Sequence, residues 1–135
     1  MQLRTVFGAA LLLSLLIGTA QAQSLSPMRK TGTTPSDVKG FKVVVGNPYD
    51  KPMVFEIIPM DPAFAVVAEH AVTRPAEVRL AAGQSRSVTV AFKIADGDEK
   101  RTIGVCVQPK EIEGNVLPRV CGTYTGIKLV PDAGG

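Results

Sequence analysis

Large apolar side chains alternate with polar ones along several stretches of the chain. Residues 87–94 show this period most clearly, because every second residue there is large and apolar: Val88, Val90, Phe92 and Ile94. Phe41, Val43 and Val45 repeat the pattern earlier in the chain. Since alternate residues of a β-strand point to opposite faces of a sheet, these stretches predict strands whose apolar residues line a core.

Further stretches rich in Val, Ile, Phe and Thr recur at intervals of roughly ten residues, separated by Pro, Gly, Asn and Asp. The clearest candidate strands cover residues 25–30, 40–45, 53–60, 85–94, 102–109 and 116–130. Short strands are also expected near residues 63–68 and in the segment that ends at Leu80, and a polar turn is expected at 31–37. The stretch 53–60 is apolar on both faces, which predicts a central strand.

No stretch after residue 22 has a sustained 3.6-residue period with helix caps, so a helical or α/β fold is disfavoured. The sequence predicts an all-β protein, a seven-stranded immunoglobulin-like β-sandwich. Its domain is expected to span residues 23–131, followed by a flexible tail at 132–135.

The first 22 residues have the pattern of a secretory signal peptide. Arg4 precedes an apolar stretch from Val6 to Ile17, and Ala20-Gln21-Ala22 has the form of a signal peptidase site. The apolar stretch is shorter than the roughly 20 residues of a membrane-spanning helix. We therefore expect cleavage after Ala22, export to the periplasm, and no membrane span in the mature chain.

The formal net charge of the whole chain is +3, and its basic residues are scattered among nearly as many acidic ones. This balance gives no extended basic surface of the kind that binds nucleic acid or a membrane. His70 is the only histidine, and the acidic residues Asp96, Asp98 and Glu99 lie in a hairpin loop without the spacing of a calcium loop. We expect neither a cofactor nor a metal, and no enzymatic activity.

The two cysteines, Cys106 and Cys121, flank one predicted turn near residues 113–115. An exported chain folds in an oxidising compartment, where two cysteines usually pair. If the hairpin closes symmetrically, the two residues stand directly opposite each other, near the spacing that a disulfide requires. The sequence thus predicts a Cys106–Cys121 disulfide that fixes the register of the last hairpin.

Four stretches, taken in order, carry a resemblance to a known family. They are SLSPMR, VVVGNPYDKP, RPAEVRLAAGQSRSVTV and VLPRVCGTYTGIKLVP. With them, the chain resembles the N-terminal immunoglobulin-like domain of the periplasmic chaperones of chaperone–usher pili, over residues 25–131. In that family, the last strand of this domain is lent to a pilus subunit that lacks its own final strand.

The resemblance implies a partner-binding site on the first and last strands. By alignment of SLSPMR and IKL, Arg29 and Lys128 would take the roles of the basic pair that holds the terminal carboxylate of a subunit. Thr123, Thr125 and Ile127 of the last strand would contact the same partner. The implied partners are secreted or pilus-type protein subunits.

Two other functions fit the sequence. The chain could be an accessory or structural immunoglobulin-like module of an envelope or surface-appendage complex, without a role in folding. It could also be a pilus subunit, although it contains a final strand of its own. An apolar, unpaired face on the last strand would favour the chaperone, and a polar or covered one would favour the accessory module.

Overall fold

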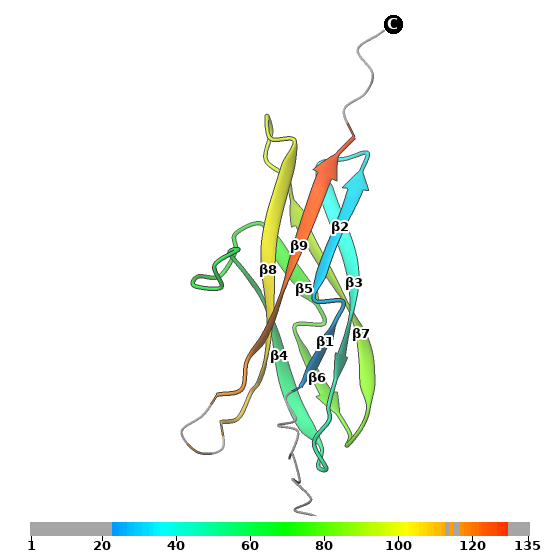
Figure 1. The fold of residues 1–135 in the computed structure, drawn as a ribbon, viewed down its shortest axis with the longest axis vertical. Helices are drawn as coiled ribbons and strands as arrows, with labels where there is room; N and C mark the ends of the chain where they lie inside the picture. The colour runs from blue at the N-terminus through cyan, green and yellow to red at the C-terminus, as the bar shows by residue number, and fades with distance from the viewer. Residues whose placement is uncertain (1–22, 113, 115–116, 130–135) are drawn as a thin grey trace, which may run out of the picture.

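A computed structural model describes residues 23–112, 114 and 117–129. The described residues form nine strands in two sheets packed face to face (Figure 1). The first sheet has the order β1 (Ser24–Ser26), β3 (Val38–Gly46), β7 (Ser85–Lys93) and β5 (Ala71–Arg74). The second has the order β2 (Arg29–Thr34), β9 (Val120–Lys128), β8 (Lys100–Pro109), β4 (Met53–Met60) and β6 (Glu77–Leu80). The described part of the chain contains no helix that could cross a membrane.

The core is the one that the apolar period predicts. Val88, Val90 and Phe92 of β7 and Phe41, Val43 and Val45 of β3 are at most 4% exposed. They face Phe55, Ile57, Val105 and Tyr124 of the other sheet, all of which are buried. β4 pairs with β8 on one side and β6 on the other, so the prediction of a central strand is confirmed.

The predicted count of seven strands is wrong, because two segments of the chain each cross from one sheet to the other. β1 lies in the four-stranded sheet and β2 in the five-stranded sheet, with Pro27 between them. β5 and β6 are divided in the same way at Pro75. Proline has no N–H to donate to a ladder, so the strand breaks there and pairing resumes with a different neighbour. Ser26-Pro27 and Arg74-Pro75 are both cis peptide bonds.

Three further predictions about strand positions are wrong. Thr31–Thr34 was expected to be part of a turn, but it continues β2, because β9 offers it a parallel neighbour. Residues 63–68 form turns with a single bridge between Met60 and Val67, not a strand. Pairing in β9 begins at Val120, four residues later than expected.

Several predicted features fall wholly or partly outside the described residues. These are the signal peptide at 1–22, most of the turn at 113–115, the first residue of the predicted last strand at 116, and the tail at 132–135.

Candidate partner-binding site

The last strand, β9, has a neighbour on each side along most of its length. β8 pairs with it in antiparallel fashion, from Lys100 opposite Ile127 to Val107 opposite Val120. β2 pairs with it in parallel fashion, from Arg29 opposite Thr123 to Thr34 opposite Lys128. The edge of β9 is therefore covered by β2 over residues 123–128, which include all four of the site residues predicted on this strand.

The start of β9 is different, because the ladder with β2 does not reach it. The N–H of Thr123 donates to the carbonyl of Met28 over 2.8 Å, and this is where the backbone ladder with β2 begins. Val120, Cys121 and Gly122 pair with β8 and have no paired residue in β2. We call these three residues the open start of β9. An unpaired strand edge can accept another strand.

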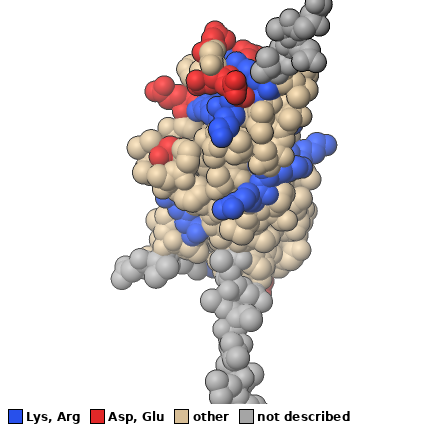
Figure 2. Space-filling view, turned by 45° about the horizontal axis from the view of Figure 1, so that its top comes forward, with Lys and Arg blue, Asp and Glu red and all other residues tan. Residues whose placement is uncertain are grey.

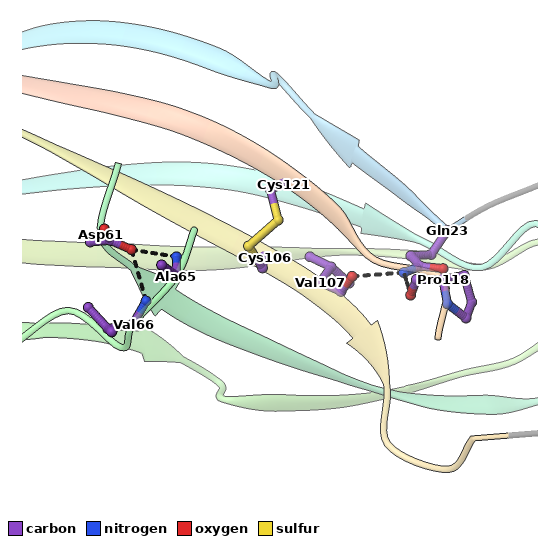
Figure 3. The surroundings of a disulfide bond; sticks show 8 residues. All are labelled: Gln23, Asp61, Ala65, Val66, Cys106, Val107, Pro118 and Cys121. Atoms are coloured by element: carbon purple, nitrogen blue, oxygen red, sulfur yellow. Dashed lines mark hydrogen bonds between the residues drawn. A yellow bond between two sulfur atoms is a disulfide. The ribbon is translucent and has the colours of Figure 1, made fainter. Parts of the chain in front are cut away.

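The predicted disulfide is confirmed and lies within the open start. Cys106 and Cys121 are direct cross-strand partners with Cα atoms 4.1 Å apart (Figure 3). Cys106 is buried, whereas Cys121 is half-buried. The bond therefore ties the open start of β9 to β8 and limits how far the strand can separate from its hairpin partner.

Gln23 closes the ladder of β8 and β9 at its lower end (Figures 1 and 3). Its side-chain Nε2 donates to the carbonyls of Val107 and Pro118, each over 2.7 Å. These carbonyls belong to the two chain segments that diverge beyond the last pair, Val107 and Val120. The buried Gln23 amide satisfies both carbonyls. A residue that precedes β1 therefore fixes the end of the β8–β9 hairpin that lies next to its connecting loop.

Tyr124 fixes the place where the first segment crosses between the sheets. Its hydroxyl donates to the carbonyl of Pro27, and its ring is fully buried against Phe41. Burial raises the pKa of the Tyr124 hydroxyl to about 12, because the phenolate would lose its hydration. Gly122 leaves room for this arrangement, since a Cβ there would lie 2.6 Å from the Tyr124 hydroxyl oxygen.

Three of the four partner-binding residues predicted on β9, all except Lys128, share one face of the sheet. Gly122, Tyr124 and Gly126 are buried, and the alternate residues Thr123, Thr125 and Ile127 point to the opposite, outer face and are half-buried. Thr125 and Thr102 of β8 share a hydrogen bond between their Oγ1 atoms, 2.8 Å apart. The outer face of β9 is thus polar, with one large apolar side chain.

The two predicted basic residues are not brought together. Arg29 lies opposite Thr123, whereas Lys128 lies opposite Thr34 at the other end of the parallel pair. With about 3.3 Å per residue, the two positions are roughly 17 Å apart along the strands. The Nζ of Lys128 donates to the carbonyl of Ala95 over 3.0 Å. In this arrangement the two side chains start far apart and on opposite faces of the sheet, which does not favour contact with the same carboxylate group.

The loop at residues 63–68, where the sequence predicts a short strand, lies beside the outer face of β8 and β9. The Asp61 carboxylate accepts the N–H groups of Ala65 and Val66 over 2.6 and 3.0 Å, and these bonds lower the pKa of Asp61 (Figure 3). Phe64 has a positive φ of 58° and packs over Gly104, which is opposite Thr123. Val66 and Val67 are left 62% and 64% exposed. The Asp-Pro pair before this apolar run is the turn signal in the sequence.

Several other titratable residues gather in one hollow of the surface. His70 lies in a surface hollow of about 470 Å³ with Glu69, Asp96 and Asp98. The Arg101 side chain spans this hollow and donates to the carbonyls of Glu69 and Lys93. Within the described residues, no three His, Cys, Asp or Glu side chains are grouped to hold a metal ion.

The fold of the chain can be compared with those of known proteins. No protein-family model and no curated protein matches this sequence. Among solved structures, the Escherichia coli chaperone DraB aligns with a TM-score of 0.65 and 17% identity, over 79% of this chain and 55% of DraB. The chain has the fold of the immunoglobulin-like domain of pilus chaperones. This confirms the fold that the family resemblance implied.

Two further structures define the range of this likeness. The Salmonella enterica SafA pilin in complex with the SafB chaperone aligns with a TM-score of 0.63 and 18% identity, over 83% of this chain and 55% of that one. The PapD-like domain 7 of human CEP192 aligns with a TM-score of 0.60 and 13% identity, over 82% of this chain and 87% of that one. The chain thus spans about half the length of the bacterial chaperones that it resembles.

Proposed function

We propose that this protein is a periplasmic, chaperone-like immunoglobulin domain that binds secreted or pilus-type subunits through its edge strands during assembly of a surface structure. The likeness in fold to pilus chaperones supports the proposal, as does the SafB structure, in which the chaperone is in complex with a pilin. Binding requires no catalytic residue, cofactor or metal, because the interaction is between protein strands and side chains.

The observation that carries the proposal is the open start of β9. Val120–Gly122 have a strand on one side only. Because Thr123 directs its N–H toward the β2 side, the N–H and C=O of Cys121, two residues earlier, point to the same side, and there a strand of a partner can pair with them. The disulfide at Cys121 and the Gln23 amide hold this segment in an extended conformation before a partner arrives. A preformed edge costs less conformational entropy on binding than a disordered one.

The predicted contact residues fit this proposal as two separate contacts. Arg29 lies opposite Thr123, so a partner on the outer face would reach it together with Thr123, Thr125 and Ile127. Lys128 lies at the far end of β9 and would contact a different part of the same partner.

A second candidate function is favoured by the cover that β2 provides. Because β2 pairs with residues 123–128, most of β9 is not available to a partner strand, and the disulfide keeps the strand on β8. Both features, together with the polar outer face of β9, suit an accessory immunoglobulin-like module that binds an envelope complex through its faces and loops. The human protein CEP192 also contains a domain of this fold, so the fold alone does not specify a chaperone.

Photo-crosslinking in the native cell distinguishes the two functions. A benzophenone amino acid replaces Val120 in the open start, and as a matched control it replaces Arg79 in β6, the opposite edge of the same sheet. For a chaperone, we expect adducts with secreted β-rich subunits from position 120 but not from position 79, and the subunits should aggregate when the protein is removed.

Two results would contradict the chaperone. Equal amounts of adduct from positions 120 and 79 would show that the open start of β9 is not the specific binding site for the subunits. Adducts from position 120 with partners that remain soluble without this protein would leave the accessory module as the better function.

A further inference from the structure

β2 forms the free edge of the five-stranded sheet beside β9 (Figure 1). The carbonyls of Met28 and Thr34 accept hydrogen bonds from Thr123 and Leu129, so these residues direct their backbone groups toward β9. Backbone groups of alternate residues point to opposite sides of a strand. The N–H and C=O groups of Arg29, Thr31 and Thr33 therefore point away from β9, at the edge of the sheet.

Three cations lie along this edge. Arg29 and Lys30 begin β2, and Lys39 of β3 reaches it from the other sheet. The Lys39 side chain passes over two glycines that are paired in register, Gly32 and Gly126. A Cβ at Gly126 would lie 2.8 Å from the Cβ of Lys39, and one at Gly32 would lie 2.8 Å from its Cε. The paired glycines thus make space for this lysine.

The charge of this edge is not neutralised within the described part of the chain. The ion pairs there join Lys93 to Asp37 and Lys110 to Glu77, and neither includes Arg29, Lys30 or Lys39. Lys39 has its Nζ 5.0 Å from the centroid of the Phe41 ring. Figure 2 shows a band of basic side chains across the middle of the protein, below a region near its top where acidic and basic side chains are mixed. We call Arg29, Lys30 and Lys39 the basic edge.

The opposite edge of the same sheet has a mixed charge. β6 carries Glu77 and Arg79 as its exposed residues, and Glu77 pairs with Lys110 over 3.0 Å. Lysines on a strand edge discourage pairing with other neutral or basic edges. The same charges favour a strand that carries carboxylates, because cross-strand pairs of opposite charge are stabilising.

We propose that the basic edge of β2 pairs with an extended acidic segment of a partner protein. The segment adds a sixth strand beside β2, through the backbone groups of Arg29, Thr31 and Thr33. Its carboxylates lie beside Arg29 on the outer face and beside Lys30 and Lys39 on the side toward the other sheet. This inference rests on the proposed function, and it specifies which strand receives the partner and the charge that the partner carries.

The test uses the full mature protein and synthetic ten-residue peptides in which pairs of threonines alternate with pairs of glutamates, glutamines or lysines, so that both faces of the added strand carry the test side chain. NMR titration follows the amide signals of all strands. We expect the glutamate peptide to shift the signals of Arg29–Thr34 and to bind more weakly as salt is raised, since the contacts are exposed to solvent. The glutamine and lysine peptides should not bind at the same concentrations.

Two variants assign the interaction to named residues. The double variant Lys30→Glu/Lys39→Met removes one cation and reverses another while keeping the apolar stem at position 39. We expect it to bind the glutamate peptide about tenfold more weakly, the size expected for two exposed charge pairs. The control Arg79→Glu changes a cation on β6 and should bind as the wild type does.

The proposal is overturned if the glutamine peptide binds as well as the glutamate peptide, or if the shifted signals belong to β6. Equal weakening by Arg79→Glu would show that only net charge matters and would also overturn it. Failure here is distinguishable from failure of the proposed function, because the crosslinks at Val120 report on β9 and do not require an acidic segment on β2.

Discussion

Tyr124 and Asp61 each fix a stretch of backbone through hydrogen bonds. The Tyr124 hydroxyl holds the carbonyl of Pro27, where the first segment changes sheets. The Asp61 carboxylate holds two N–H groups of the loop that follows β4. At the scale of single residues, the shape of the β9 region therefore depends on polar groups as well as on the apolar core.

Tyr124→Phe tests the first of these contacts. The change leaves the Pro27 carbonyl without its donor, so we expect a loss of about 1–3 kcal/mol in the free energy of unfolding. In the wild type, the unfolded state ionises near pH 10 while the folded state keeps its proton up to about pH 12. The contribution of the protonated Tyr124 side chain to the free energy of unfolding is therefore fully present below pH 10 and is lost as the pH rises toward 12.

Urea denaturation between pH 8 and 11.5 measures both effects. Tyr49, the other tyrosine, is unchanged in the variant and provides the same background in both proteins. The stability of Tyr124→Phe should fall less steeply above pH 10 than that of the wild type. Parallel curves would mean that the hydroxyl is not held in the buried site described here.

Asp61→Ala removes the carboxylate that organises the loop after β4. The lowered pKa of Asp61 means that its contribution to stability is present above pH 3.8 and is lost as the pH falls through the folded-state pKa. We expect faster amide exchange at Ala65 and Val66 in the variant at pH 7. The difference in stability between variant and wild type should narrow below pH 3.8.

Asp96→Ala is the matched control, because Asp96 is an exposed acid in the loop after β7 and accepts no backbone N–H in the described part of the chain. It should leave the exchange of Ala65 and Val66 unchanged. An equal effect of both substitutions would assign the result to net charge and not to the hydrogen bonds of Asp61.

At the scale of strands, β9 has two neighbours that differ in how they hold it. β8 is tied to it by the disulfide and by the Gln23 amide, whereas β2 pairs with it through backbone hydrogen bonds over six residue pairs. The open start depends on the first set of contacts alone. This division predicts that the two halves of β9 respond differently to loss of the disulfide.

The double variant Cys106→Ala/Cys121→Ala tests this division. Closure of a loop with a sequence separation of 15 residues stabilises a fold by about 3 kcal/mol in the chain-entropy model, so we expect a loss of that size in urea denaturation. Amide exchange should accelerate most at Val120–Gly122 and least at Thr123–Ile127, which β2 still holds. Reduction of the wild type should give the same pattern, and a uniform increase along β9 would contradict it.

Local patterns predicted the strands that contribute most to the core. The alternation at Val88–Ile94 and the spacing of the two cysteines need only the period of a strand and the symmetry of a hairpin. The strand at Thr31–Thr34 has no apolar signal, and it forms because β9 supplies a neighbour. The apolar run at residues 63–68 looks like a strand, but Asp61 and the positive φ of Phe64 make it a loop.

The geometry of the candidate site was less accessible from the sequence. That Thr123, Thr125 and Ile127 share a face follows from a period of two. The separation of Arg29 from Lys128 follows instead from the parallel register of β2 and β9, which are far apart in the chain. Such a register is set by contacts across the whole sheet, so a local motif such as SLSPMR does not reveal it.

At the scale of the whole molecule, two chain segments join the sheets of the sandwich. The first runs from β1 into β2, and the second from β5 into β6, so each sheet contains part of both. The two segments form opposite sides of the sandwich, because β1 and β2 lie at one end of their strand orders and β5 and β6 at the other. The basic edge belongs to the first side, which also contains the open start of β9.

The parallel pairing of β2 with β9 has a mechanical consequence. β2 and β9 lie side by side and run in the same direction, and β9 ends near the top of the molecule (Figure 1). Tension applied to the two ends of the domain would therefore pull β2 and β9 past each other along their length. The hydrogen bonds of the whole ladder would bear this load together and would not open one at a time like a zipper.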